Sequence, residues 1–365
     1  MGSREPGENR ARGVLASGSR LLCYTVGLFP QVWRAGEWFL RSGIQVPNGG
    51  VARYYRSDLQ RNHAVSTEIT GYAASALVFL ERHDQARSAA RFLANVWHPA
   101  AAMPFEVDPA QFTYFFDCGI VARGLLSVWR ATGDDDFLKC ARAIGDSMAR
   151  DFRAPDGGFY PILALPGKGP VERDAARWSR SPGCYQLKAG LAWWELWEAT
   201  GESSYREHYC HLRDAALHTE ADFLPGHADL RKVVDRLHAY LYFLEGLLPI
   251  PCAVLADGIG RVAGLVRELA PGFERSDVYA QLLRVRLFAD SAGVAKLDRN
   301  AAQSEVECLL EFAAVSDDPR IDGGFYFGRS AGQWEPYVSP VSTAFALQAL
   351  AMWSGGAPPN RRMLI

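Results

Sequence analysis

Two carboxylates stand in apolar helical segments, where a charge is out of place. Glu68 lies in the segment His63–Tyr72, and Asp117 directly follows Phe115 and Phe116. A carboxyl group that aromatic side chains shield from water has a raised pKa, and the protonated form is the one that a general acid needs. Both residues are therefore candidate catalytic groups. Capping of their own helices, or pairing with a nearby cation, is the structural alternative.

A repeated sequence indicates the elements that hold these residues. The segment 129–137, WRATGDDDF, recurs at 197–205 as WEATGESSY. In each copy a glycine ends one apolar helical run, acidic or hydroxyl residues cap the next run, and an aromatic residue anchors it. The repeat predicts that the fold is built from helical hairpins.

Apolar residues spaced three and four apart, with Gly and Pro between the runs, predict twelve helices. They span about 17–42, 65–82, 86–97, 113–131, 135–152, 184–199, 203–219, 233–248, 257–270, 276–290, 300–315 and 339–354. Alternate runs are apolar on nearly all sides, as buried helices are, and their neighbours carry one charged face. This alternation predicts an inner ring of six helices inside an outer ring of six. An open solenoid also pairs helices, but it keeps a more constant repeat length.

Three Asx-Gly-Gly sequences lie in long loops between an outer helix and the next inner one. They are Asn48–Gly50, Asp156–Gly158 and Asp322–Gly324. Each predicts the tight positive-φ turn of a short β-hairpin. Turn chemistry explains these glycines better than phosphate binding, because no GxGxxG or Walker pattern follows a strand.

All inner helices of such a ring run in the same direction, so their N-terminal ends meet at one mouth, where helix dipoles favour anions. Besides Glu68 and Asp117, the candidates at this mouth are His63, Tyr72, Tyr185, Lys188, His238, Tyr240 and Tyr242, the loop residues Arg53, Tyr54, Tyr55, Trp334, Glu335 and Tyr337, and the helix-end residues Asp277, Gln281 and Ser339. Aromatic faces stack on the C–H faces of sugars, and carboxylates bind hydroxyls, so the set favours a saccharide or oligosaccharide. Core packing explains the tyrosines at 240 and 242 equally well.

The Ala-Thr-Gly hairpin turns, the Asp-Gly-Gly-Phe-Tyr loops and the twelve-helix count resemble the α/α-toroid proteins. This six-hairpin glycosidase-like group also includes uronate lyases, epimerases and terpenoid cyclases. The resemblance covers about 17–355 and implies an all-α (α/α)6 toroid, a barrel of six helical hairpins with short β-hairpin-like loops at its mouth. A cyclase would bring an aspartate-rich motif on an inner helix, and the only candidate, Asp134–Asp136, lies in a turn where capping explains it.

The resemblance implies a carbohydrate-active enzyme, with a glycoside hydrolase as the first expectation. Glu68 and Asp117 would then be the acid and the base or nucleophile. In a uronate lyase or epimerase, His63, Tyr72 or His238 would remove the C5 proton while Arg53 neutralises the substrate carboxylate. A noncatalytic saccharide-binding protein would use the same mouth. We expect no cofactor and no metal, because the adjacent Asp117 and Cys118 point about 100° apart on a helix and no further ligand spacing is present.

Composition narrows the partners and the compartment. The chain of 365 residues is 48% hydrophobic with a formal net charge of −2, so neither nucleic acid nor an anionic membrane is an expected partner. Seven scattered cysteines without a CxxC pair indicate reduced thiols and a cytoplasmic location. The apolar segment Leu21–Trp33 is too short to span a bilayer, and we expect no signal peptide. The expected organisation is a flexible tail at 1–14, one toroid domain at 15–356 and a C-terminal tail at 357–365, with the oligomeric state left open.

Overall fold

The computed structural model describes residues 30–100, 102–174, 177–270 and 272–365, and its helices agree with the predicted runs. The inner helices are α3 (Thr67–Phe79), α5 (Phe115–Thr132), α7 (Leu187–Thr200), α9 (Leu230–Gly246), α11 (Ser276–Ser291) and α13 (Pro340–Trp353). The outer helices are α2 (Pro30–Arg41), α4 (His83–Val96), α6 (Asp135–Asp151), α8 (Ser203–Thr219), α10 (Ala253–Leu269) and α12 (Arg299–Glu311). The part of the first predicted helix before Pro30, and the predicted tail at 1–14, lie outside the described residues.

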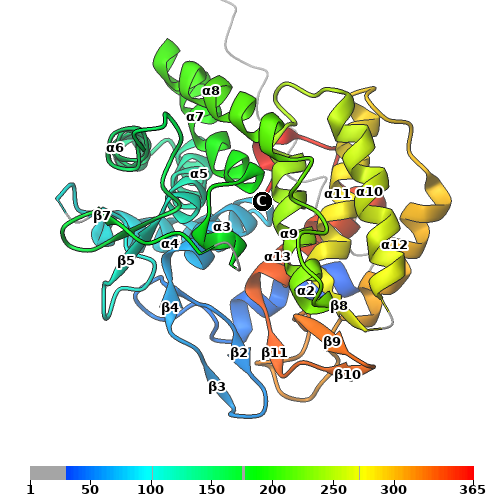
Figure 1. The fold of residues 1–365 in the computed structure, drawn as a ribbon. Helices are drawn as coiled ribbons and strands as arrows, with labels where there is room; N and C mark the ends of the chain where they lie inside the picture. The colour runs from blue at the N-terminus through cyan, green and yellow to red at the C-terminus, as the bar shows by residue number, and fades with distance from the viewer. Residues whose placement is uncertain (1–29, 101, 175–176, 271) are drawn as a thin grey trace, which may run out of the picture.

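The inner helices form a closed ring. Each one contacts the next in the order α3, α5, α7, α9, α11 and α13, and α13 returns to α3. The outer helices α4, α6, α8, α10 and α12 each pack against the inner helix that precedes them in the chain, and α2 packs against α13 (Figure 1). The predicted all-α double ring of six hairpins is therefore confirmed, with the sixth hairpin made from the first and last described helices.

The repeated hairpin turns have the predicted conformation. Gly133 and Gly201 end α5 and α7 in the left-handed region, with φ of 70° and 77°. Asp134 caps α6 by accepting a hydrogen bond from the Asp136 N–H at 3.2 Å. The aromatic anchors Phe137 and Tyr205 are both 2% exposed. Each turn thus fixes an outer helix against the inner helix before it.

Short antiparallel strands occupy the loops that lead into inner helices. They are β1 (Val51–Ala52), β2 (Tyr55–Arg56), β3 (Arg61–Asn62), β4 (Val65–Ser66), β5 (Phe112–Tyr114), β6 (Ile162–Ala164), β7 (Gly169–Pro170), β8 (Phe273–Arg275), β9 (Gly328–Ser330), β10 (Gln333–Trp334) and β11 (Tyr337–Val338). They form four small sheets, in the orders β1-β4, β11-β2-β3, β5-β6-β7 and β10-β9-β8. The sheet β11-β2-β3 joins the first and last loops, so it ties the two ends of the ring together at the mouth.

Inner helices α3, α5 and α7 approach with their backbones in contact. A Cβ atom on Gly119 of α5 would lie 2.5 Å from Cα of Ala189 on α7. A Cβ atom on Gly124 of α5 would lie 2.6 Å from the carbonyl oxygen of Gly71 on α3. Only glycine fits at such contacts, so these positions set how tightly this side of the ring closes.

Residues 357–365, which the sequence analysis left outside the domain, return into the ring. Leu364 and Ile365 are buried, and the C mark lies at the centre of the ring in Figure 1. The carbonyl oxygen of Ile365 accepts hydrogen bonds from Lys188 Nζ at 3.0 Å and from Arg284 at 3.2 Å, and that of Leu364 accepts one from Arg123 at 2.6 Å. These contacts to α5, α7 and α11 make a polar floor inside the ring.

The floor contains a buried carboxylate between two cations. Lys188 Nζ lies 2.7 Å from Glu245 Oε2, and Arg284 bonds the other carboxylate oxygen. Burial alone would raise the pKa of Glu245, but Arg284 and Lys188 together hold it below its usual value. Burial also lowers the pKa of Lys188 to about 7, so Arg284 is the cation that keeps its full charge at neutral pH. The charges are therefore satisfied within the protein. No helix in the described part of the chain has the length and apolar content needed to cross a membrane.

Candidate active site

A cleft of about 270 Å³ opens at the mouth of the ring. It lies between the first turns of α3, α11 and α13, one side of α9, and the loops that carry β2 and β11. Its lining residues are Arg53, Tyr54, Glu68, Ile69, His238, Tyr242, Arg275, Asp277, Phe327, Tyr337, Ser339 and Val341. Acidic, basic and aromatic side chains thus meet at the N-terminal ends of α3, α11 and α13, whereas His238 and Tyr242 come from the middle of α9.

Glu68 is the second residue of α3 and reaches the cleft from the side of that helix. Ser66 already caps α3, because its hydroxyl accepts a hydrogen bond from the Ile69 N–H, so Glu68 is not needed as the cap. Burial raises the pKa of Glu68 to about 7, and the positive charge of Arg53 opposes that rise. The carboxyl group is therefore partly protonated near neutral pH and borders open space.

Asp117 lies on the neighbouring inner helix and is more deeply placed. Its side chain is 5% exposed, and its Oδ2 has no hydrogen-bond partner among the described residues. Burial raises its pKa well above the usual value, negative charge on Glu68 raises it further, and Arg53 opposes both. Asp117 thus holds a proton beside Glu68, but it does not line the cleft. Its pKa does not suit the ionised base that the sequence analysis considered.

His238 lines the same cleft as Glu68 and is neutral. Burial lowers its pKa to about 4, against the opposing charge of Asp277. Its Nδ1 lies 2.6 Å from Gln281 Oε1 and 3.5 Å from Asp277 Oδ2, so the ring proton sits on Nδ1 and the lone pair on Nε2. Arg275 holds Asp277 through two hydrogen bonds, of 3.0 and 2.6 Å. The Gln281 amide oxygen, with the Asp277 carboxylate close by, thus fixes the ring orientation of a candidate general base.

An aromatic layer lies beneath these groups, between the mouth and the floor. The rings of Tyr72 and Tyr242 stack with centroids 6.5 Å apart, and Phe116 lies 4.6 Å from Tyr242. Phe345 of α13 meets Tyr72 edge-on at 5.3 Å. The buried phenol of Tyr72 keeps its proton, because burial raises its pKa well above the usual value. These rings remove water from around Glu68 and Asp117, which is the physical cause of their raised pKa values.

The rim of the cleft is built from the hairpin loops. The ring of Tyr54 lies 4.9 Å from Tyr337 and 4.7 Å from His63. His63 is exposed, so it lies at the outer edge. Arg53 lies over the Phe105 ring at 5.0 Å and 4.0 Å from the Glu106 carboxylate. The rim offers aromatic faces and one cation to a ligand.

Two of the predicted binding tyrosines, Tyr240 and Tyr55, face away from the cleft, and the geometry of a helix and of an extended chain explains why. Residues 240 and 242 lie about 200° apart around a helix, so only Tyr242 reaches the cleft. Tyr240 instead donates a hydrogen bond to Glu220 at 2.6 Å. Successive residues of an extended chain point to opposite sides, so Tyr54 lines the cleft and Tyr55 is buried on the other side.

Four further predicted binding residues also lie outside the cleft lining. Tyr185 is buried, and its hydroxyl donates to the Ser181 carbonyl at 3.0 Å. Lys188 belongs to the floor. Trp334 is 42% exposed and stacks on Tyr326, whereas Glu335 pairs with Arg231 at 2.6 Å. Each of these side chains is explained by a contact within the protein.

Arg275 and Phe327 line the cleft but were not among the sequence candidates. Arg275 ends β8 two residues before Asp277, and this spacing next to a helix start is the signal that could have found it. Phe327 precedes β9 in a loop, and nothing in its local sequence marks it. Within the described ranges, no three His, Cys, Asp or Glu side chains gather in a way that could hold a metal ion.

The closed double ring with a cleft at its mouth is the (α/α)6 toroid fold, and solved structures share it. No family model and no curated protein matches the sequence. A cellobiose 2-epimerase from Spirochaeta thermophila DSM 6192 has a TM-score of 0.66 and 14% identity, covering 91% of this chain and 97% of its own. A D-mannose isomerase has a TM-score of 0.61 and 10% identity, and the match covers 93% of this chain and 98% of the isomerase. A GH76 α-mannanase from Bacteroides thetaiotaomicron has a TM-score of 0.58 and 12% identity, and the match covers 89% of this chain and 97% of the mannanase.

These likenesses confirm the resemblance to six-hairpin (α/α)6 proteins at the level of the fold. They extend over nearly the whole of both chains, so the ring is shared in full rather than in part. At such low identity they do not assign a reaction, and the function has to be argued from the cleft itself.

Proposed function

We propose that the protein is a carbohydrate-active enzyme in which Glu68 is the general acid and His238 the general base. The observation that carries the proposal is the reversed order of two pKa values in one cleft. The pKa of Glu68 is about 7 and that of His238 about 4, so between these values the carboxyl group holds its proton and the imidazole is free to accept one. Both groups are then in the form that acid–base catalysis requires.

The first reaction we propose is hydrolysis of a glycosidic bond. Glu68 would donate its proton to the glycosidic oxygen, and His238 would take a proton from the attacking water through Nε2. Asp277 and Gln281 would orient the imidazole. The aromatic rings of Tyr54, Tyr242 and Tyr337 suit the faces of sugar rings.

A second reaction uses the same two groups on a different proton. His238 would remove a proton from carbon next to a carbonyl or carboxyl group. In an epimerase Glu68 would return a proton to that carbon, and in a lyase Glu68 would protonate the glycosidic oxygen as its bond to carbon breaks. The observation that favours it is the position of Arg53 in the lining that also holds His238, where its charge would stabilise the negative charge that develops. The sugar epimerase and isomerase among the structural neighbours support this candidate through their fold.

The test is turnover of a panel of neutral and uronate-containing disaccharides in D₂O. Hydrolysis releases reducing ends without carbon-bound deuterium, epimerisation places deuterium on a sugar carbon, and elimination leaves an unsaturated sugar without deuterium on carbon. We expect Glu68→Gln and His238→Gln each to lower kcat by about 10²- to 10⁴-fold with little change in ligand affinity. We also expect wild-type activity to fall above pH 7 and below pH 4, and Glu68→Gln to lose the alkaline limb.

Glu305→Gln is the matched control. Burial also raises the pKa of Glu305 to about 7, but this residue lies on outer helix α12 and pairs with Arg286, far from the cleft lining. Its substitution should leave kcat and the pH profile unchanged. Saccharide binding without turnover by the native protein, or full activity in both cleft variants, would contradict the proposal.

A further inference from the structure

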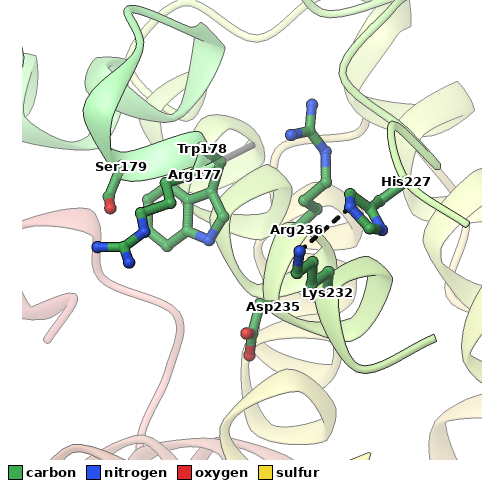
Figure 2. A pocket seen from close by; sticks show the side chains of 7 residues that line it. All are labelled: Arg177, Trp178, Ser179, His227, Lys232, Asp235 and Arg236. Atoms are coloured by element: carbon green, nitrogen blue, oxygen red, sulfur yellow. Dashed lines mark hydrogen bonds between the residues drawn. The ribbon is translucent and has the colours of Figure 1, made fainter. Parts of the chain in front are cut away.

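A second pocket lies beside the cleft, between the turn that precedes α7 and the start of α9. It has a volume of about 190 Å³ and is lined by Arg177, Trp178, Ser179, His227, Lys232, Asp235 and Arg236 (Figure 2). Three of these side chains are cationic and one is anionic. The charge balance therefore differs from that of the cleft, where acids and cations alternate.

The single acid of the pocket is already paired. Asp235 Oδ1 lies 2.6 Å from Arg275, which also holds Asp277. Arg275 offsets only part of its charge, because Arg275 is shared with Asp277, but one acid against three cations still leaves the pocket lining net positive. The same bond places the pocket next to the cleft, because Asp235 lines one and Arg275 lines the other.

Two of the cations have no carboxylate partner among the described residues. Lys232 Nζ lies 3.3 Å from His227 Nε2, and Figure 2 shows the amine turned toward that ring. Arg236 lies over the Phe223 ring at 4.3 Å and donates through Nε to the Phe223 carbonyl, which leaves its terminal nitrogens unused. Cations that share a pocket repel one another, and an anion between them removes that cost.

An aromatic side chain faces the cations across the pocket. Trp178 meets Tyr185 edge-on at 4.9 Å, so its position is fixed by the ring beneath it. The indole and Arg177 come from one segment, and Lys232 and His227 come from the other (Figure 2). An aromatic face opposite free cations suits a sugar ring that carries a negative group.

We propose that this pocket binds the acidic unit of an anionic saccharide, with Lys232 and Arg236 holding its carboxylate or phosphate and Trp178 stacking on its ring. The inference rests on the proposed function, since it names the substrate class of the same enzyme: a saccharide with an acidic unit adjacent to the one that reacts beside His238. The shared chemistry is a sugar-borne anion, and the experiment distinguishes its two sources.

The test measures binding by calorimetry, without turnover, for glucuronate, glucose 6-phosphate, inorganic phosphate and glucose. We expect at least one of the two sugar anions to bind, glucose to bind at least tenfold more weakly, and Lys232→Met to weaken the anion at least threefold. Lys232 is exposed, so this substitution does not threaten the fold. Trp178→Ala should weaken the sugar anion more than inorganic phosphate. Preference for glucuronate or for glucose 6-phosphate identifies the carboxylate or the phosphate as the group bound.

Controls separate this inference from the proposed function. Lys139→Met, on outer helix α6, removes an exposed lysine elsewhere and should leave anion binding unchanged. Glu68→Gln should keep anion binding while turnover is lost. Equal binding of acidic and neutral sugars, or wild-type binding by both Lys232→Met and Arg236→Met, would overturn the pocket assignment while leaving the acid–base proposal intact. If the protein shows no turnover but binds the anion in a way that depends on Lys232, the acid–base proposal is overturned and the pocket assignment is kept.

Discussion

Glu68 and His238 exchange the protonation order that free glutamate and histidine have in water. Burial causes both shifts, because it penalises the charged form of each group: the carboxylate of Glu68 and the imidazolium of His238. The same shifts act on stability, in opposite directions. The folded state binds an extra proton at Glu68 between pH 4.5 and 7, and it lacks one at His238 between pH 4 and 6.5.

Glu68→Gln should therefore change how stability depends on pH. The wild-type carboxyl group favours the folded state less and less as pH rises from 4.5 to 7, because the unfolded chain ionises first. The amide does not titrate, so the variant has no such dependence. Its Tm minus that of the wild type should therefore increase by on the order of 2 °C from pH 5 to pH 8. Thermal unfolding at several pH values measures this. A Tm difference that stays constant with pH would show that Glu68 titrates alike in both states.

A charge that breaks an apolar helical pattern is an incomplete guide to the cleft, because Asp117 breaks such a pattern without lining the cleft. Glu68 and His238 each place an ionisable group in a helix that is otherwise buried, and both reach the cleft. Tyr240 and Tyr242 differ only in helical phase, which the sequence fixes relative to each other but not relative to the ring axis. Knowing which of the two faces inward required the packing of α9 against its neighbours.

Among the elements, close contact between α5 and α7 sets a sharp steric limit. Gly119→Ala should destabilise the protein by about 1–3 kcal/mol, because the new methyl group would lie 2.5 Å from Cα of Ala189 and the helices would have to separate. Gly264→Ala on outer helix α10 is the matched control, since a Cβ there has no neighbour within 4 Å. It should stabilise the helix by about 0.5–1 kcal/mol. Urea unfolding compares the two, and equal effects would contradict the close approach.

The sequence predicts which segments are helices and how they pair. It does not predict how far each helix is shifted along the axis of the ring. The turns at Gly133 and Gly201 predict two hairpins directly, and the apolar spacing predicts the rest. However, α9 begins at Leu230, so His238 lies eight residues, or about 12 Å, along this helix and still borders the mouth cleft. Asp277 borders the same cleft from the second residue of α11. This shift of one helix relative to the next is set by tertiary packing, and no local sequence pattern indicates it.

At the scale of the whole molecule, we expect the buried ionic floor to stabilise the fold and to take no part in ligand binding. Lys188→Met should cost about 3–5 kcal/mol, because it leaves Glu245 with a single partner and the Ile365 carbonyl with one donor fewer. Saccharide affinity should not change, since Lys188 lies outside the cleft lining. Lys139→Met, which removes an exposed lysine, should have no measurable effect on unfolding. Lost affinity without lost stability would return Lys188 to the binding residues.

The inward-folded segment at Leu364 and Ile365 also constrains how a polymer could use this ring. With these residues buried among α5, α7 and α11, the ring is closed below the cleft, and a saccharide can enter and leave only through the mouth. If the protein is the glycosidase proposed above, a polymer that inserts its end into the cleft should be shortened from that end. Small products should then accumulate before the average polymer length falls.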